Sequence, residues 1–424
     1  ATRPFGEDFL GQRRGGITAL LLEYARAETR APERAIMRLS VLDWAVCGMA
    51  GRAEGGFGDW AATLDGQGPC TRFDGRASGA AEAALVNGTL SHALDYDDTH
   101  FAHIGHPSVV VVSAALALAQ VRGSSLPEMI DAALVGAEAS VAAGLWLGRG
   151  HYQVGFHQTA TAGTFGACVA AGRLLGLDDA QMRHALGLAS TMASGLKSQF
   201  GTMGKPLNAG LAARAGVEAA LFASVGMTSA EDGLDGPLGF AETHHGAGDA
   251  VPFAWRMCGV SHKFHACCHG LHATLEALSL VEDPRGAEAV TIETHPRWLT
   301  VCNTSEPQTG LEAKFSYVHV TAMAAHGIST ADVAQFSDAC AQRPDLVAWR
   351  KRVTVVGDPE LGETQARVVI DDASYAADLA GVDADARAGR LVAKARALVG
   401  ARADDLVAAM EADDLPAFAQ LLTS

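Results

Sequence analysis

The strongest constraint on the fold is a succession of apolar, alanine-rich segments with helical spacing that fills roughly the first 255 residues. Many of them are apolar on more than one face, which is typical of helices buried inside a large bundle. Ser125 with Glu128, and Asp178 with Gln181, fit the capping boxes that begin two of these helices. The segments cover residues 17–28, 35–50, 78–94, 108–121, 127–147, 178–194 and 207–225.

The pattern changes near residue 285. Residues 289–294, 352–356 and 366–370 alternate between apolar and polar side chains, as strands do, and helical segments at 313–326 and 331–340 lie between them. Helical periodicity returns from about residue 385. We therefore expect a mainly α fold with a large all-helical domain over residues 1–260 and a smaller α+β domain over residues 261–394. Residues 395–424 either extend the small domain or complete the large one.

The net charge limits the classes of partner. The chain has 32 Lys and Arg residues against 48 Asp and Glu residues, which gives a net charge of −16. Such a surface repels nucleic acids and anionic membranes. The longest charge-free apolar runs, such as residues 108–121, are also shorter than the roughly 18–20 residues of a membrane span. We expect neither nucleic acid nor a membrane as a partner, and an anionic substrate needs a local basic pocket.

The eight cysteines are scattered and form no CxxC pair. In a chain of 424 residues this usage is typical of reduced thiols in a cytoplasmic protein, most of them small buried hydrophobic side chains. Glu7 and Asp8 do not fit a secretory signal. We therefore expect a cytoplasmic location.

The densest polar cluster extends from His92 to Ser108. A carboxylate beside an imidazole raises the pKa of the imidazole and fixes its tautomer, as a general acid or base requires. Pro107 ends the loop and Ser108 can cap the next helix, so His106 should lie at a helix N-terminus, where a bound carboxylate is favoured. The cluster holds three carboxylates and four imidazoles: Asp95, Asp97, Asp98, His92, His100, His103 and His106.

Two other interpretations fit the same cluster. Its charges can belong to a solvated surface turn without function. Alternatively, His100, His103 and His106, with Asp97 or Asp98 as a fourth ligand, can form a Zn, Fe or Ni site, which would indicate a metal-dependent hydrolase. The proline after His106 argues against the helix that would align these three imidazoles.

Three further clusters carry candidate site residues. His157 precedes a threonine-rich helix start, which is again a setting for an anion. Lys197 and Lys205 flank a glycine-containing loop, and the following proline should keep Lys205 out of a helix. Lys263 lies at the junction of the two expected domains, a common location for ligand pockets.

Each of these clusters also has a structural interpretation. His157 can be a capping or core histidine, and the lysines can be solvated loop residues. Cys268 and His272, four residues apart, can form a nucleophilic Cys–His pair, although no third orienting group is evident.

Together these segments resemble the MmgE/PrpD family, and the motifs occur in the family's order along nearly the whole chain. The resemblance implies a large all-helical domain with a smaller α+β lid domain, usually in a homodimer. The matching motifs are Asn87-Gly88, His92-Ala-Leu-Asp-Tyr-Asp-Asp98, His106-Pro-Ser108, Gly155-Phe-His157-Gln-Thr159, Thr164-Phe-Gly-Ala167, Phe200-Gly-Thr-Met-Gly-Lys205-Pro206, Lys263-Phe-His-Ala-Cys-Cys268 with His272, and Ala313-Lys-Phe-Ser316.

The family's activities are dehydration of 2-methylcitrate, decarboxylation of cis-aconitate and epimerisation of iminodisuccinate, none of which needs a metal or organic cofactor. Lys197 and Cys268 stand where the decarboxylase branch has methionine and histidine, and they resemble the epimerase branch. The residues that match pocket positions of the decarboxylase branch are Asp95, Thr99, His106, His157, Lys205 and Lys263.

The resemblance implies a cofactor-independent lyase, of the dehydratase or decarboxylase type, that acts on a small di- or tricarboxylate by proton transfer at the carbon α to a carboxylate. The alternatives are an epimerase of an iminodisuccinate-like dicarboxylate, the metal-dependent hydrolase described above, and a helical scaffold with an incidental polar pocket.

We expect His106 to transfer the proton, Asp95 to orient the His106 ring and Thr99 to bind a substrate oxygen. The substrate carboxylates should lie against Lys197, Lys205, Lys263 and the donor His157. In an epimerase, Lys205 or Cys268 would be the second acid/base. All of these roles require residues 106, 205 and 263 to converge on one cavity.

Overall fold

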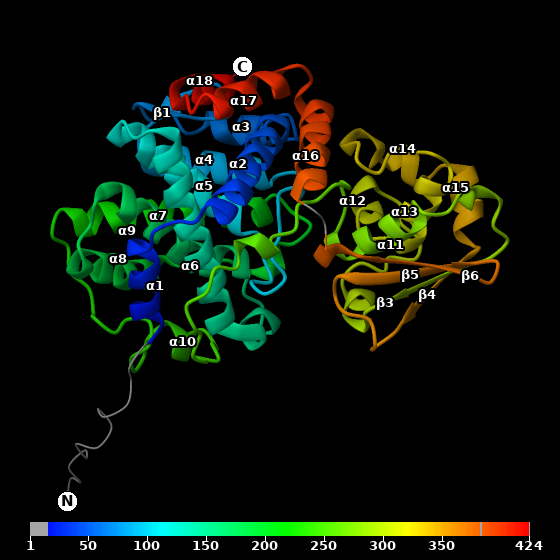
Figure 1. The fold of residues 1–424 in the computed structure, drawn as a ribbon, viewed down its shortest axis with the longest axis horizontal. Coiled ribbons are helices and arrows are strands. Elements are labelled where there is room, and N and C mark those ends of the chain that lie inside the picture. The colour runs from blue at the N-terminus through cyan, green and yellow to red at the C-terminus, as the bar shows by residue number, and fades with distance from the viewer. Residues whose placement is uncertain (1–15, 382–383, 424) are drawn as a thin grey trace, which may run out of the picture.

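The computed structural model describes residues 16–381 and 384–423, which form a large helical body and a smaller α+β part (Figure 1). The helices of the body are α1 (Ile17–Arg26), α2 (Ala31–Gly51), α3 (Phe57–Ala62), α4 (Ala80–His92), α5 (Pro107–Arg122), α6 (Leu126–Gln153), α7 (Gln158–Leu175), α8 (Asp179–Met192), α9 (Gly204–Ser224) and α10 (Phe240–Thr243). A short hairpin of β1 (Cys70–Thr71) and β2 (Ala77–Ser78) precedes α4. The expected mainly α architecture is confirmed.

Small side chains bring the central helices of the body close together. A Cβ atom added at Gly166 of α7 would lie 2.4 Å from the carbonyl oxygen of Gly136 in α6, and one added at Gly88 of α4 would lie 2.9 Å from Cα of Gly210 in α9. Side chains larger than hydrogen at these crossings would force the helices apart. Both predicted capping boxes are present, at Ser125 for α6 and Asp178 for α8.

The α+β part contains a four-stranded sheet of β3 (Val290–Thr294), β4 (Val353–Gly357), β5 (Gln365–Ile370) and β6 (Ala373–Asp378) in the order β4-β3-β5-β6. β3 is parallel to β4 and antiparallel to β5, which is antiparallel to β6. Alternate residues of β3 and β5 are buried, and α11 (His272–Leu278) and α13 (Tyr317–Ala325) pack on the sheet. The remaining helices of this part are α12 (Gly310–Ala313), α14 (Asp338–Ala341) and α15 (Pro344–Arg350).

In this region one expectation needs correction and one strand was missed. The segment 331–340 is not one helix, because a 3₁₀ turn at Val333–Gln335 and the short α14 replace it. Ser337 caps α14 through its side chain and so begins a new helix inside that segment. The edge strand β6 was not expected, because its side chains are small, largely exposed and without a clear apolar alternation.

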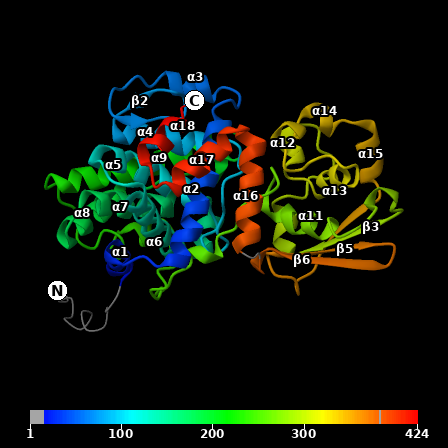
Figure 2. The ribbon, with the colours of Figure 1, turned by 45° about the horizontal axis from the view of Figure 1, so that its top comes forward.

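The chain returns to the helical body through α16 (Ala384–Val399), α17 (Arg402–Glu411) and α18 (Leu415–Leu421). α16 packs on α2 and lies between the body and the α+β part in both views (Figures 1 and 2). A buried ion pair joins α16 to α2, since Lys394 Nζ of α16 lies 2.5 Å from Asp43 Oδ1 of α2. Lys394 Nζ also donates a hydrogen bond to the Tyr96 carbonyl at 2.6 Å. The boundary expected at residue 395 therefore falls inside α16.

By length and composition alone, α6 could cross a membrane, but 89% of its most apolar window is buried inside the protein, as in a core helix. The search for charge-free apolar runs did not select this segment because charged residues such as Glu138 interrupt it.

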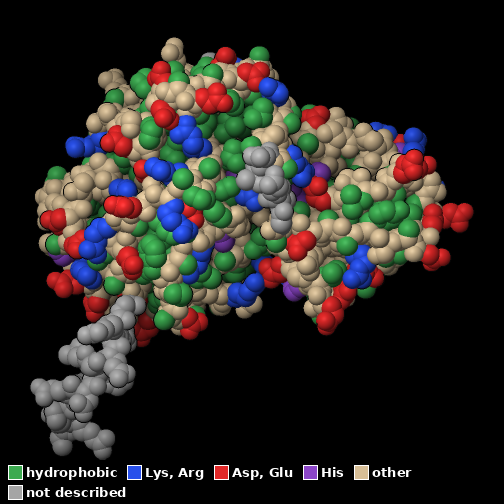
Figure 3. All heavy atoms as spheres, in the orientation of Figure 1, with side chains coloured by type: hydrophobic (Ala, Val, Ile, Leu, Met, Phe, Trp, Pro, Cys, Tyr) green, Lys and Arg blue, Asp and Glu red, His purple; other side chains and the backbone are tan. Residues whose placement is uncertain are grey.

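All eight cysteines lie within the described residues and are free thiols. Acidic and basic side chains both occur over the helical body on the face in Figure 3.

Candidate active site

The segment between α4 and α5 turns sharply at Asp95, whose backbone has φ +52°, a left-handed conformation that few non-glycine residues adopt. The carbonyl of Asp95 accepts a hydrogen bond from Lys263 Nζ at 2.7 Å. The Asp95 carboxylate lies 2.5 Å from Lys205 Nζ, 3.4 Å from Lys263 Nζ and 3.4 Å from His106 Nε2. The turn thus presents one carboxylate to two amines and an imidazole from distant parts of the chain.

A cavity of about 740 Å³ surrounds this group, with lining residues from the helical body and from the α+β part. Every site residue predicted from the sequence lines it: Asp95, Thr99, His106, His157, Lys197, Lys205, Lys263 and Cys268. The structure therefore brings together residues that are up to 173 positions apart in sequence (268 − 95 = 173).

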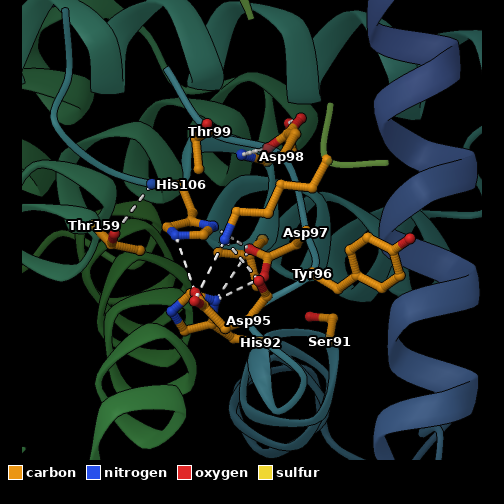
Figure 4. A network of polar contacts seen from close by, with 12 residues as sticks. Ser91, His92, Asp95, Tyr96, Asp97, Asp98, Thr99, His106 and Thr159 are labelled. Carbon is orange, nitrogen blue, oxygen red and sulfur yellow. Dashed lines mark hydrogen bonds and ion pairs between the residues drawn. The ribbon is translucent and has the colours of Figure 1, made fainter. Parts of the chain in front are cut away.

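Asp97 holds two imidazoles at once (Figure 4). His106 Nδ1 lies 2.9 Å from Asp97 Oδ2, and His92 Nδ1 lies 2.9 Å from Asp97 Oδ1. A carboxylate only accepts hydrogen bonds, and the carboxylate of Asp97 lies closer to Nδ1 (2.9 Å) than that of Asp95 lies to Nε2 (3.4 Å). This arrangement therefore favours the proton of His106 on Nδ1 and leaves Nε2 as the basic nitrogen. Asp95, the expected orienting residue, contacts Nε2 of the same ring at 3.4 Å, so the ring lies between two carboxylates, and the shorter contact is that of Asp97.

The protonation states follow from burial and charge. Burial lowers the pKa of His106 to about 4, against the opposing effect of Asp97, so the ring is neutral at pH 7. Burial by itself raises the pKa of Asp95. The positive charges of Lys205 and Lys263 oppose this effect and bring the pKa well below its usual range. Lys263 is buried, yet Asp95 raises its pKa above the usual value. The site at pH 7 thus pairs a neutral base with a charged carboxylate and charged amines.

His157 and the two loop lysines line the adjacent wall. His157 is the N-cap residue of α7, and its Nδ1 lies 3.2 Å from Asn208 Nδ2. Burial holds the pKa of His157 well below its usual value. Lys197 begins the 3₁₀ turn Lys197–Gln199, and its Nζ lies 3.7 Å from the ring centroid of Tyr152. Lys205 lies inside the first turn of α9 rather than outside a helix, because a proline is tolerated in a first turn.

Thr99 connects the two halves of the site. Its backbone pairs with Ser261 through hydrogen bonds of 2.9 and 2.7 Å, which bring Lys263 beside Asp95. The Thr99 hydroxyl is hydrogen-bonded to Nδ1 of His269.

The Cys268 thiol is buried, and a hydrogen bond with Cys302, together with the charge of Lys263, lowers its pKa.

The MmgE/PrpD N-terminal domain family matches residues 19–251, and the MmgE/PrpD C-terminal domain family matches residues 265–405. The chain belongs to the MmgE/PrpD family. The family correspondence covers both the helical body and the α+β part, in agreement with the architecture described above.

Among the relatives of this MmgE/PrpD chain are three proteins named cis-aconitate decarboxylase. The protein from Aspergillus terreus is 31% identical over 224 residues, which cover 48% of this chain and 46% of that protein. The proteins from Homo sapiens and Mus musculus are 33% and 35% identical over 170 residues, or 37% of this chain. The similarity thus spans less than half of the length of these relatives.

Two alternatives for this MmgE/PrpD site do not fit the geometry. His100 Nε2 contacts the Arg256 carbonyl at 2.9 Å, and His103 Nε2 contacts Ser140 Oγ at 2.6 Å. Among the described residues, neither imidazole belongs to a group whose ligand atoms lie close enough to share one ion with His106. The metal site proposed on these three histidines is therefore wrong. His272 Nε2 contacts the carbonyl of Cys267, which gives no support to a nucleophilic pair with Cys268.

Within residues 16–381 and 384–423, one group has ligand atoms close enough to hold a metal ion: His92, Asp97 and His106. Its members already contact one another, two Nδ1 atoms on one carboxylate. This makes the group a triad of two imidazoles on one carboxylate, which positions His106.

Sequence reasoning also missed part of the cavity wall. Arg149, Tyr152, Arg297 and Glu363 line the same cavity. These residues come from the end of α6, a 3₁₀ turn and a loop between strands, so no local motif joins them. Asp97 carried a signal, since it lies in the densest polar cluster, but spacing alone does not tell which carboxylate faces the ring.

Proposed function

We propose that this protein is a lyase of the dehydratase or decarboxylase type that acts on a small di- or tricarboxylate. The observation that carries the proposal is the convergence of Lys205, Lys263 and His106 Nε2 on one carboxylate, that of Asp95, in a cavity lined by both parts of the structure. Amines placed in this way also bind a substrate carboxylate. A unit charge pair about 4 Å apart contributes roughly 4 kcal/mol at an effective dielectric constant of about 20, before desolvation.

The chemistry follows from the tautomer of His106. Its Nε2 can accept a proton from the carbon α to a substrate carboxylate, while Asp97 stabilises the imidazolium that forms. The electron pair left on carbon is delocalised into the carboxylate beside the lysines. In a dehydration, this pair forms the C=C bond, and the leaving hydroxide takes up the proton from His106 and departs as water. In a decarboxylation, His106 Nε2 first takes up a proton from solvent, the C–CO₂ bond then breaks, and the carbanion takes that proton.

The relatives named cis-aconitate decarboxylase support a lyase on an unsaturated or hydroxylated tricarboxylate. One observation favours a second candidate, an epimerase of an iminodisuccinate-like dicarboxylate. Cys268 lines the cavity beside Lys263 with a thiol of lowered pKa, so it can serve as a second acid/base on another face of the substrate.

The remaining expectations are part of the same proposal. We expect catalysis without a metal or organic cofactor, in a homodimer located in the cytoplasm. Activity that is lost with a chelator and restored by Zn or Fe would contradict the first expectation, and light scattering and cell fractionation test the other two.

A panel of polycarboxylates incubated with the protein in D₂O and followed by ¹H and ¹³C NMR tests the proposed function. A lyase produces a new alkene signal or loses CO₂ from at least one compound. Deuterium at the α carbon with inversion and without net elimination would identify the epimerase. The absence of any product or exchange across hydroxylated, unsaturated and amino-substituted members would contradict both.

A further inference from the structure

A second group of charges lies on the cavity wall, formed by residues that contact neither Asp95 nor His106 in any described ion pair. Arg149 Nη2 lies 2.8 Å from Glu363 Oε1, and Arg297 Nη1 lies 2.6 Å from Glu363 Oε2. All three residues line the cavity that contains Asp95. Arg149 belongs to the helical body, whereas Arg297 and Glu363 belong to the α+β part. One carboxylate is thus shared between two guanidinium groups across the boundary of the two parts.

Local backbone geometry explains how this group is assembled. Gly148 interrupts α6 with φ +71° and ψ −179°, a conformation open to glycine, and the residues after it, including Arg149, turn toward the cavity. On the opposite side, the indole N–H of Trp298 donates to the backbone carbonyl of Glu363 at 2.9 Å. The guanidinium of Arg297 lies 5.0 Å from the Trp298 ring centroid. Arg297 and Glu363 are therefore held in fixed positions by the same tryptophan.

The balance of charge in this group favours anions. Arg149, Arg297 and Lys197 line the cavity. Among the described ion pairs of the two arginines, Glu363 supplies the one carboxylate. Lys197 Nζ lies 3.7 Å from the Tyr152 ring centroid, and both side chains line the same cavity as Arg297. Paired guanidinium groups recognise planar carboxylates through parallel hydrogen bonds. The group therefore has the chemistry of a carboxylate-binding subsite that is occupied by the protein's own carboxylate.

We propose that Arg149 and Arg297 bind a second, distal carboxylate of the substrate and that Glu363 competes with it for the two guanidinium groups. The substrate is then a molecule with at least two separated carboxylates, one at Lys205 and Lys263 and one at the arginine pair. This inference rests on the proposed function for its reaction, but it concerns binding and is tested by binding alone.

Isothermal titration of the wild-type protein with linear dicarboxylates of three to six carbons, and with their monoamides, provides the test. The monoamide replaces one carboxylate by a neutral group of the same shape. Arg297→Gln removes the less exposed guanidinium, which is 20% accessible, and should weaken dicarboxylate binding about tenfold while changing monoamide binding less than twofold. Arg149→Gln, at 56% accessibility, repeats the test with a smaller effect in the same direction.

The direction in which Glu363→Gln changes dicarboxylate affinity shows whether Glu363 competes with the substrate carboxylate or only links the helical body to the α+β part. Glu363→Gln should tighten dicarboxylate binding at least threefold, because the competing charge is gone. Glu360→Gln, an exposed residue of the same loop, makes the same charge change and should leave binding unaltered. Weaker or unchanged binding in Glu363→Gln, with equal effects of Arg297→Gln on dicarboxylate and monoamide, would overturn the subsite. That result would leave the proposed function intact if wild-type turnover of a polycarboxylate persists.

Discussion

Replacing Asp97 by asparagine tests the contact that gives His106 its function. The carboxylate of Asp97 accepts a hydrogen bond from Nδ1 of His92 at 2.9 Å and lies 2.9 Å from Nδ1 of His106. An asparagine side chain has one accepting oxygen and one donating nitrogen, so it cannot satisfy two Nδ1–H groups. One imidazole must change its tautomer, and where that ring is His106, its Nε2 becomes a donor and can no longer accept the substrate proton.

The size of the effect follows from the charge that is lost. When His106 becomes an imidazolium, Asp97 lies within an ion-pair distance of it. At a separation of about 4 Å and an effective dielectric constant of about 20, this attraction is roughly 4 kcal/mol. A loss of that size lowers the rate about 10³-fold, since 1.36 kcal/mol corresponds to a factor of ten. We therefore expect Asp97→Asn to reduce kcat about 10³-fold with a smaller change in KM.

Two measurements check this prediction. Steady-state kinetics on the best substrate of the polycarboxylate panel give kcat and KM, and ¹⁵N NMR of the histidine rings reports which nitrogen of His106 carries the proton. Asp98→Asn is the matched control, because Asp98 accepts from Ser40 and Ser108 rather than from His106. Its kcat should stay within a few-fold of the wild-type value. A wild-type kcat in Asp97→Asn, with the His106 proton still on Nδ1, would refute the reasoning.

Three further predictions concern stability and binding. Lys394→Met leaves Asp43 buried without its cation and should lower the free energy of unfolding by about 3–5 kcal/mol in urea titrations, whereas Arg396→Met in an exposed ion pair should change it by less than about 1 kcal/mol. Burial raises the pKa of Asp98 to about 7, so the folded protein keeps a proton that the unfolded chain releases near pH 4. The Asp98 contribution to stability is therefore fully present below about pH 4 and is lost as the pH rises to about 7. In urea titrations across this range, the free energy of unfolding of Asp98→Asn should depend less on pH than that of the wild type. An unchanged pH dependence contradicts the raised pKa of Asp98. Lys205→Met should raise the Kd of a dicarboxylate at least tenfold in calorimetry, and an unaltered Kd would remove this amine from the binding site.

The helical body could be predicted from the sequence because its helices carry an unbroken apolar period over many residues. The same reasoning failed where a short segment obeys local capping instead, as at Ser337, or where a strand is exposed, as in β6. The periodicity of apolar residues indicates which faces are buried, so it does not predict an edge strand whose side chains are small and solvated.

The eight predicted site residues could be found because polar clusters at the ends of apolar helices stand out, and because their motifs resemble one family. Their relative positions depend on backbone turns that the sequence does not state. The left-handed backbone of Asp95 directs its carboxylate to Lys205 and leaves Asp97 to hold His106. Arg297 and Glu363 meet only after the sheet and the 3₁₀ turn have formed, so no local pattern connects them.

The central claim is that His106 Nε2 moves a proton at the carbon α to a substrate carboxylate. The most direct measurement is the rate of deuterium incorporation from D₂O at that carbon during turnover, compared between wild type, His106→Gln and the control His103→Gln, whose imidazole contacts Ser140 instead. The account predicts exchange in the wild type and in His103→Gln, and a reduction of about 10² or more in His106→Gln. Exchange at the wild-type rate in a folded His106→Gln protein would contradict it.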